Sequence, residues 1–328
     1  MKILVVGGAG YIGSHTVHAL CERGDKVVVM DSLVTGHLQS VHPKAKFFLG
    51  DVRNRKDLIT VFQENKFDAV VHFAAFIEVG ESVSNPLKYF DNNSAGMISL
   101  LEVMRDFKVG RLVFSSTAAV YGEPRNIPIL EDDPKEPTSP YGESKLIMER
   151  VMKWTGEAHG IRWVSLRYFN VGGALPGGTI GEDHNPESHL IPLILRVPMG
   201  LRESISIYGD DYPTPDGTCI RDYLYIMDLA DAHLKALDYL AKGGKSVICN
   251  LGNGKGFSVK EMIETARSVT GHPLPVVVTP RRPGDPARLV ASSERARKVL
   301  GWKPKTGIET IIATAWEWHS KHPRGFGG

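Results

Sequence analysis

The sequence contains little cysteine, no long hydrophobic run and no excess of one charge. Its three cysteines, Cys21, Cys219 and Cys249, are an odd number without metal-ligand spacing, which is typical of free thiols in a reducing compartment. We therefore expect a cytoplasmic protein without a metal site. No apolar run approaches the ~20 residues of a membrane helix. Lys and Arg total 39 against 37 for Asp and Glu, which excludes the broad basic surface of a nucleic-acid-binding protein.

The chain does have enough apolar material for a substantial core, because hydrophobic residues make up 42% of its 328 positions. The first half alternates short apolar runs, rich in β-branched residues, with stretches whose apolar residues recur at helical spacing. The pattern predicts strands at Ile3–Val6, Lys26–Met30, Phe47–Leu49, Ala69–Phe73, Leu112–Phe114 and Trp163–Leu166, and helices such as Tyr11–Glu22 and Asp57–Glu64. Runs that are apolar on both faces predict an α/β fold with a doubly wound parallel sheet, the Rossmann arrangement.

A cluster of glycines and prolines after Asn170 predicts a domain boundary. We expect a first domain over 1–170 and a smaller α/β domain over 171–328, parts of which return to pack on the first. In the second half the pattern predicts helices at Leu190–Arg196, Met227–Ala241, Val259–Val269 and Ile308–Trp318, strands at Ser204–Tyr208 and Val247–Leu251, and a polar loop over Asp210–Asp222.

The first expected strand runs directly into a glycine-rich turn that opens the first helix. Gly7, Gly8, Gly10 and Gly13 supply both GxxGxxG and GxGxxG spacing, which suits a tight turn and the approach of a diphosphate to a helix N-terminus. Asp31 ends the next strand 18 residues after Gly13. An acid there binds the adenosine ribose and favours NAD over a 2′-phosphorylated cofactor. The alternatives are a simple glycine turn and an acid that caps a loop.

Two further segments fall at the predicted carboxyl edge of the sheet, where a dinucleotide would lie. Asp51 follows the third strand, and Phe73, Ala74 and Ala75 end the fourth. Small residues at this edge leave room for a ligand. Taken singly, each of them is equally compatible with ordinary core packing.

Tyr141 and Lys145 are spaced to share one face of a helix that starts after Pro140. The fifth strand ends in the hydroxyl cluster Ser115–Thr117, at the edge where a nicotinamide would lie. A tyrosine with a pKa of ~10 is a poor base at pH 7, and lowering that pKa by ~3 units requires about 4 kcal/mol. A neighbouring ammonium group and an oxidised nicotinamide could supply this energy. Without such a context, the pair would be an exposed aromatic beside a solvated lysine.

Seven blocks, in order along nearly the whole chain, resemble the UDP-galactose 4-epimerases, which are extended short-chain dehydrogenase/reductases. The blocks are GGAGYIGSHT (7–16), GDVRN (50–54), VGESV (79–83), FSSTAAVYG (114–122), SPYGESK (139–145), LRYFNVGGA (166–174) and DYPTPDGTCIRDY (211–223). The resemblance implies an isomerase of galactose metabolism that interconverts UDP-galactose and UDP-glucose with tightly bound NAD. In that family, hydride leaves C4 of the sugar, the 4-ketose rotates, and the hydride returns to the other face.

The resemblance also implies a role for each matching residue. Tyr141 is the base, Lys145 lowers its pKa and holds the nicotinamide ribose, and Thr117 hydrogen-bonds the 4-oxygen. Besides the residues named above, those implied to line the cofactor are Tyr11, Ile12, Ser32, Val52, Asn92, Ser115, Tyr168 and Phe169. Those implied to hold the UDP-sugar, besides Thr117 and Tyr141, are Asn170, His189, Leu190, Ser206, Ile207, Tyr208, Arg221, the stretch from Arg282 to Asp285, and Leu289.

Two arginines agree with such a substrate on chemical grounds. Arg221 and Arg282 lie in separate polar loops, from which their planar guanidinium groups could converge on a nucleotide diphosphate. Ordinary solvated arginines are the alternative. Tyr208 could stack on the uracil ring, or it could be a core aromatic at a strand end.

Three positions depart from the family pattern. Ile77 stands where many members have a lysine that contacts the cofactor, so binding could be weaker. His189 replaces a common asparagine in the substrate loop. Leu289 replaces a tyrosine found near the sugar 2-substituent in strict glucose/galactose enzymes. Its shorter side chain predicts space for the N-acetyl group of UDP-GlcNAc or UDP-GalNAc.

Other activities on the same fold are alternatives. A 4,6-dehydratase would need Asp-Glu after Thr117, where this chain has Ala118 and Ala119, and alanine cannot transfer protons. A UDP-uronate epimerase or decarboxylase stays open. The rival of a different class is a non-catalytic NAD-binding regulator, which would have no reason to keep Thr117 together with Tyr141 and Lys145.

Two amphipathic stretches, Leu87–Phe107 and Tyr141–His159, are expected in the first domain. In the family that the chain resembles, these helices form a four-helix bundle between two subunits. The resemblance therefore implies a homodimer. The expected small-molecule partner is a UDP-sugar, and neither nucleic acid nor membrane is expected as a partner.

Overall fold

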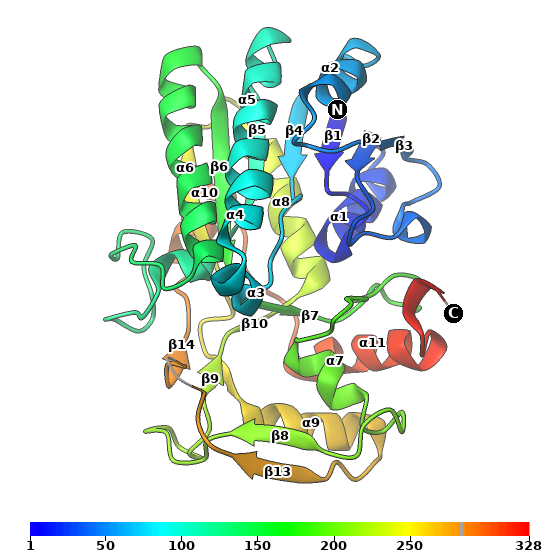
Figure 1. Ribbon diagram of the computed structural model, residues 1–328, viewed down its shortest axis with the longest axis vertical. Helices are drawn as coiled ribbons and strands as arrows, with labels where there is room; N and C mark the ends of the chain where they lie inside the picture. The colour runs from blue at the N-terminus through cyan, green and yellow to red at the C-terminus, as the bar shows by residue number, and fades with distance from the viewer. Residues whose placement is uncertain (283–284, 328) are drawn as a thin grey trace.

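The computed structural model describes residues 1–282 and 285–327. A seven-stranded sheet with strand order β11-β6-β5-β4-β1-β2-β3 forms the centre of its larger part (Figure 1). All neighbouring strands in this sheet are parallel. The strands are β1 (Lys2–Val6), β2 (Lys26–Asp31), β3 (Lys46–Leu49), β4 (Ala69–His72), β5 (Arg111–Thr117), β6 (Arg162–Tyr168) and β11 (Val247–Leu251). The predicted doubly wound parallel sheet is thus confirmed.

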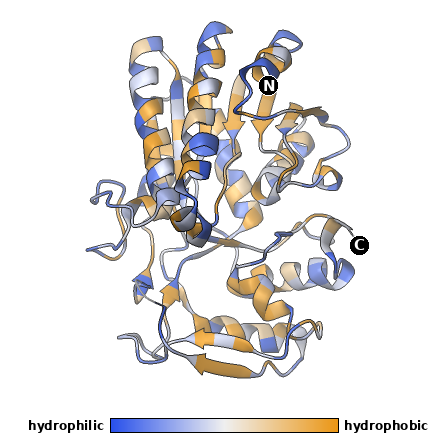
Figure 2. Ribbon diagram, in the orientation of Figure 1, coloured by the Kyte–Doolittle hydropathy of each residue, from blue (hydrophilic) through white to orange (hydrophobic). Residues whose placement is uncertain are grey.

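Helices cover both faces of this sheet because its strands are apolar on both sides. Ile3 and Val5 of β1 pack into one core cluster, and Leu4 and Val6 pack into another on the opposite face. The first cluster includes α1 (Tyr11–Glu22), α8 (Ile226–Ala241) and α10 (Glu294–Leu300), and the second includes α2 (Arg55–Gln63), α5 (Gly96–Asp106) and α6 (Pro140–His159). Figure 2 shows the resulting band of hydrophobic strands between the helices.

The smaller part is built around a third apolar cluster. It contains α7 (Leu190–Leu195), α9 (Val259–Thr270), α11 (Ile308–Lys321) and the parallel pair β8 (Ile205–Tyr208) and β13 (Val276–Thr279). Two short sheets complete it: β7 (Asn170–Gly172) with β10 (Tyr223–Tyr225), and β9 (Ile220–Arg221) between β12 (Phe257–Ser258) and β14 (Arg288–Leu289). The expected loop over Asp210–Asp222 was therefore wrong at its end, because a two-residue strand such as β9 leaves no periodicity to detect.

Short helical segments follow β4 and β5 at the carboxyl edge of the large sheet. They are α3 (Val79–Ser84), α4 (Pro86–Tyr89), the π-helix η2 (Phe90–Ala95) and the 3₁₀ turn η3 (Ala118–Tyr121), with η1 (Leu38–Ser40) and η4 (Gly325–Gly327) elsewhere. None of the helices in the described ranges combines the length and the apolar character needed to cross a lipid bilayer.

Candidate active site

The glycine-rich turn lies between β1 and α1, packed tightly against the end of β4. Gly7 has φ +82°, and a Cβ atom there would lie 2.4 Å from the main-chain nitrogen of Ala74. A Cβ atom on Gly13 would lie 2.1 Å from the oxygen of Gly7, whereas one on Gly10 would meet nothing closer than 3.6 Å. Gly7 and Gly13 are therefore required by the turn itself. Gly10 is the N-cap of α1, and because it has no side chain, the main-chain N–H groups of the helix N-terminus stay accessible to a ligand.

Asp31 ends β2 and holds the same turn from its other side. Its Oδ2 atom accepts a hydrogen bond from the main-chain N–H of Ala9 at 2.9 Å, and Oδ1 accepts one from Leu33 at 2.9 Å. Burial raises the pKa of this carboxyl group, and both hydrogen bonds oppose that rise. Ser32, the next predicted cofactor residue, is exposed beside it.

The remaining predicted cofactor residues of the first half differ in whether their side chains are free to contact a ligand. Asp51 is engaged by Arg53, whose Nη2 atom lies 2.6 Å from its Oδ2. Val52 turns its side chain into the core. The segment Phe73–Ala75 follows β4, where Phe73 and Ala74 donate main-chain hydrogen bonds to Val6 at the end of β1.

Lys145 is buried in α6 with its ammonium group against the end of β5. Its Nζ atom donates to the main-chain oxygen of Ser115 at 2.9 Å and lies 5.0 Å from the centre of the Phe114 ring. The Ser115 hydroxyl is hydrogen-bonded to the phenol of Tyr168 on β6. Burial lowers the pKa of Lys145 to about 7, and the carboxylate of Glu149 only partly opposes this.

Tyr141 lies in the first turn of α6, directly opposite η3. The Ser139 hydroxyl caps this helix by accepting from the N–H of Gly142 at 3.2 Å. A Cβ atom on Gly142 would lie 2.6 Å from the oxygen of Ala119, so the two segments approach as closely as glycine allows. Burial raises the pKa of the Tyr141 phenol, and the Thr117 hydroxyl opposes this rise.

Sequence analysis missed the buried ion pair that holds α6 on the sheet. Arg167 of β6 donates from Nη2 to Oε2 of Glu149 at 2.5 Å and from Nε to Oε1 at 3.0 Å. The hydroxyls of Ser116 and Ser165 each donate to Oε1 of Glu149 at 2.7 Å. Because Glu149 lies one helical turn beyond Lys145, this network fixes the position of the lysine. The available signal was a glutamate at a helix position otherwise occupied by apolar residues.

A second missed residue, Asn93, links the π-helix η2 to α6. Its side chain accepts from the N–H of Phe76 at 2.9 Å and donates to the Phe76 oxygen at 3.1 Å and to the Ser144 hydroxyl at 3.0 Å. Asn92, the predicted cofactor residue, precedes it and donates to its Oδ1 at 3.0 Å. π-helical turns are frequent at functional sites.

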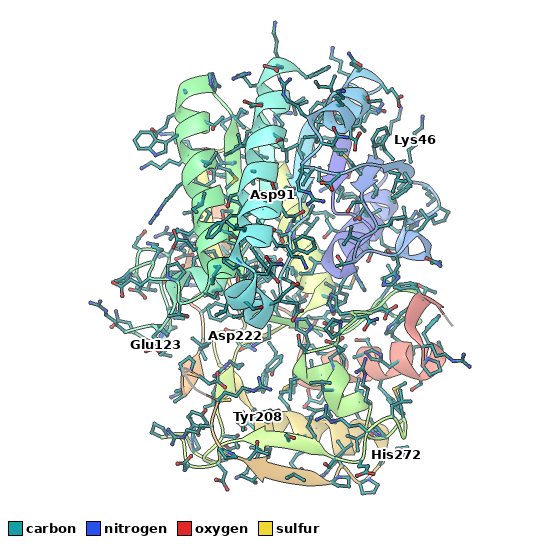
Figure 3. The ribbon with its side chains drawn as sticks, in the orientation of Figure 1. Lys46, Asp91, Glu123, Tyr208, Asp222 and His272 are labelled. Carbon is teal, nitrogen blue, oxygen red and sulfur yellow. The ribbon has the colours of Figure 1, made fainter. Side chains whose placement is uncertain are left out.

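A cavity of about 250 Å³ opens in the smaller part of the molecule. Eight of the predicted substrate residues line it: Asn170, His189, Leu190, Ser206, Tyr208, Arg221, Arg282 and Asp285. Ile207 instead turns its side chain into the core on the opposite face of β8, so only its main chain is available to a ligand. Arg202 and Cys219 also line the cavity and were not predicted. Figure 3 labels Tyr208 beside β8 and Asp222 where the two parts meet.

Two arginines of the cavity already have partners within it. Arg221 forms an ion pair with Asp285. The guanidinium carbon of Arg282 lies 3.8 Å from the centre of the Tyr208 ring, and this cation lowers the pKa of the Tyr208 phenol. The predicted stretch from Arg282 to Asp285 also contains Pro283 and Gly284, which lie outside the described residues.

The other predicted residues lie around the end of β5 and the turn of α1. Leu289 and Phe169 pack, together with Ala118, against a small apolar cluster that includes Leu146 of α6. Tyr11 donates from its hydroxyl to the oxygen of Gly173 at 2.6 Å. Ile12 packs against both the sheet core and the core of the smaller part.

The comparisons with known proteins agree over the full length of the chain. Residues 4–315 match the family model described as GDP-mannose 4,6 dehydratase. The chain is 57% identical over 100% of its length to a UDP-glucose 4-epimerase of Lacticaseibacillus casei, covering 99% of that protein. It is 60% identical to one of Streptococcus mutans serotype c (strain ATCC 700610 / UA159), covering 99% of each chain.

The solved structures similar to this chain are also described as 4-epimerases of UDP-sugars. A crystal structure described as UDP-glucose 4-epimerase has a TM-score of 0.98 at 52% identity, covering 99% of each chain. The Bifidobacterium longum UDP-glucose 4-epimerase in complex with NAD⁺ and UDP has a TM-score of 0.93 at 39% identity, covering 99% of this chain and 100% of that one. The UDP-Glc/GlcNAc 4-epimerase from Campylobacter jejuni has a TM-score of 0.87 at 41% identity, covering 98% of this chain and 99% of that one.

Proposed function

Since the chain belongs to the GDP-mannose 4,6 dehydratase family of the matched model and, through its full-length relatives, to the UDP-glucose 4-epimerases, we propose that it interconverts UDP-galactose and UDP-glucose by transient oxidation at C4. The observation that carries this proposal is the close approach of Gly142 to η3, because Tyr141 directly precedes Gly142 and Thr117 is the N-cap of η3. The two alanines after Thr117 offer no acid or base for a dehydration.

NAD fits the chain's own residues. The turn at Gly7–Gly13 brings main chain, rather than side chains, to the N-terminus of α1, which is the environment that a diphosphate prefers. Asp31 would bind the adenosine ribose, and no arginine occurs over 32–35 to accept a 2′-phosphate. Tyr168 and Lys145 would hold the nicotinamide half from β6 and α6. When bound, NAD supplies a reversible acceptor for the hydride of C4.

Tyr141 would take the proton of the sugar 4-hydroxyl, and Thr117 would hold the 4-oxygen in place. In the protein alone, burial raises the pKa of the phenol, and the Lys145 ammonium group is itself poorly solvated. The phenol therefore becomes an effective base only where further positive charge, such as that of an oxidised nicotinamide ring, lies beside it. The same tyrosine returns the proton when the sugar is reduced on its other face.

The cavity would receive the UDP group. Arg221 and Arg282 are planar donors that match phosphate oxygens, and both now have local partners, Asp285 and the Tyr208 ring. A diphosphate would compete with Asp285 for the guanidinium of Arg221. Movement of Arg282 from Tyr208 would free the ring to stack on uracil.

The substrate range would include N-acetylhexosamines. Leu289 lies with Phe169 and Ala118 beside the end of β5, where a tyrosine would fill more space. The expected result is measurable epimerisation of UDP-GlcNAc by the native protein and its loss in Leu289→Tyr with UDP-galactose turnover retained. Absence of UDP-GlcNAc turnover in the native protein contradicts this part of the proposal.

The protein would act as a homodimer. Large apolar side chains are exposed on the side formed by α4, α5 and α6, among them Leu87 (78% exposed), Ile98 (45%) and Trp154 (67%), and such patches mark interaction surfaces. Light scattering at micromolar concentration is expected to give twice the chain mass, and Trp154→Glu with Ile98→Glu is expected to give monomers. We also propose a cytoplasmic location, which the buried free cysteines support and which cell fractionation tests.

One experiment tests the central proposal. The purified protein is incubated with UDP-galactose deuterated at C4, without added NAD. The expected product is UDP-glucose of unchanged mass that retains the deuterium, because the hydride returns to the carbon that it left. A product lighter by water or carbon dioxide, or loss of the deuterium to solvent, contradicts it.

A further inference from the structure

A cluster of histidine and glutamate side chains lies just before α7, and only one of its four members, His189, is also a predicted substrate residue. Glu182, His184, Glu187 and His189 alternate along one eight-residue segment. One donor atom from each lies within 4.8 Å of all the others. Only 5% of the Glu182 side chain and 2% of the Glu187 side chain are exposed. Two carboxylates buried to this extent require a cationic partner.

The distances within the cluster are near those between the ligands of a small metal ion. Nδ1 of His184 lies 3.3 Å from Oε1 of Glu182 and 3.8 Å from Oε2 of Glu187. Nδ1 of His189 lies 3.1 Å from Oε1 of Glu182 and 2.9 Å from Oε1 of Glu187. Four ligands at about 2.0–2.2 Å from a central ion are separated from one another by about 3.3–3.6 Å. The five atoms, since both carboxylate oxygens of Glu187 take part, are thus separated by distances near those between the ligands of a small dication.

The surroundings of one of these nitrogens agree with metal binding. Nδ1 of His184 is buried and, among the described residues, has no hydrogen-bond partner, although it points toward both carboxylates. A buried ring nitrogen without a partner is unfavourable. Its lone pair is the group with which a neutral imidazole binds a metal.

We propose that Glu182, His184, Glu187 and His189 form a four-ligand Zn²⁺ site that shapes the wall of the substrate cavity. Imidazole nitrogen and carboxylate oxygen in tetrahedral arrangement suit zinc. Since the protein fills all four positions, the site is structural rather than catalytic. His189 lines the cavity, and Leu190 begins α7 immediately after it.

The site would also connect the cavity to the nucleotide turn. The His184 ring packs edge to face on Tyr11 at a centroid distance of 6.1 Å, and Tyr11 begins α1. A bound ion would thus fix the loop at one end of the cavity against the helix that receives the diphosphate. This inference does not depend on the epimerase proposal, because it concerns ion binding alone.

Cobalt and zinc titrations test the site in the full-length, untagged protein after removal of metals with a chelator. We expect one equivalent of Co²⁺ with the intense visible absorption of four-coordinate cobalt, displaced by one equivalent of Zn²⁺. His184→Gln is expected to weaken Zn²⁺ binding at least about 10-fold. His42→Gln is the matched control, since Nε2 of His42 lies 3.5 Å from Oε1 of the half-exposed Glu22; its affinity should be unchanged.

Equal Zn²⁺ affinity of the native protein and His184→Gln overturns the proposal. So does a cobalt complex with only the weak spectrum of six-coordinate ions, or the absence of binding at micromolar metal. In that case the four groups are ion pairs between imidazolium and carboxylate. If His184→Gln does not fold, Glu187→Gln is measured in the same way, and the native cobalt spectrum decides the coordination number.

Discussion

The ammonium group of Lys145 donates to the main-chain oxygen of Ser115 across 2.9 Å and thereby ties α6 to the end of β5. The lysine is 3% exposed, so its charge is held in a poorly solvated place. The position that serves the proposed chemistry is therefore unfavourable for the charged form of this side chain in the NAD-free protein.

Stability should consequently depend on pH through Lys145. Its pKa is lowered from 10.5 to about 7 in the folded chain, a difference that corresponds to about 5 kcal/mol. This destabilisation of the folded state is fully present below pH 7, where Lys145 is protonated in both states. It disappears as the pH rises toward 10.5, because the unfolded state then also loses the proton from this lysine. Lys145→Met should be more stable than the NAD-free native protein at pH 6. Denaturant unfolding at several pH values should show the difference shrinking toward pH 10; a constant difference contradicts the assignment.

Removing the phenolic hydroxyl should affect chemistry and not the fold. Tyr141→Phe is expected to lower kcat about 10²- to 10⁴-fold, the usual contribution of a general acid–base group, with melting temperature and NAD content unchanged. Tyr239→Phe on α8 is the matched control and should be fully active. Native-like turnover by Tyr141→Phe would show that another group moves the proton.

The Glu149–Arg167 pair should contribute strongly to folding. Glu149→Ala leaves Arg167 buried without its partner, and breaking a buried ion pair costs about 3–5 kcal/mol. Equilibrium unfolding measures this loss. The double variant Glu149→Met with Arg167→Met should recover part of it, since no uncompensated charge then remains. A double variant as unstable as the single one would mean that the serine hydrogen bonds, not the charges, dominate.

Neighbouring arginines provide a comparison for nucleotide binding. Arg282 lies over Tyr208 in the cavity, whereas Arg281 lies over Tyr212 and donates from Nε to Oδ1 of Asp211 at 2.7 Å. Arg282→Gln should weaken UDP binding about 10- to 100-fold, the value of one or more charge-assisted hydrogen bonds. Arg281→Gln should leave it unchanged. Calorimetric titration with UDP measures the affinity of both variants. Equal losses of affinity in the two would exclude a specific contact between Arg282 and UDP.

Two glycines of the nucleotide turn should respond differently to alanine. Gly13→Ala places a methyl group 2.1 Å from the Gly7 oxygen and should destabilise the fold. Gly10→Ala meets no protein atom within 3.6 Å and should fold normally, but its methyl group would obstruct a diphosphate at the N-terminus of α1. Thermal melting and NAD content of the purified variants distinguish these outcomes. Full NAD content in Gly10→Ala would place the diphosphate elsewhere.

Sequence reasoning predicted well what depends on local pattern. The strands of the large sheet, the glycine turn and Asp31 at the end of β2 follow from β-branched runs and from spacing. It missed the partners that only the tertiary structure brings together. Arg167 of β6 contacts Glu149 of α6, and Asn93 of η2 contacts Ser144 of α6. Neither contact produces a periodic pattern in the sequence.

The very short strands and the cluster of glutamate and histidine side chains were also not predicted from the sequence. The two-residue strands β9, β12 and β14 are too brief for any alternation to be read. Within the segment Glu182–His189, Sequence analysis singles out only His189, as the replacement of a common asparagine in the substrate loop. Its chemical character depends on four side chains converging on one point, and that convergence is a property of the folded loop.

The strand β11 comes from residues 247–251 yet pairs with β6 at the border of the large sheet. During synthesis, the first 170 residues therefore emerge with one side of β6 lacking its hydrogen-bonding neighbour, and such open strands invite association with other chains. The nucleotide-binding half can reach its final form only after about three quarters of the polypeptide has left the ribosome. Any attempt to express that half by itself would have to provide a substitute for the missing strand.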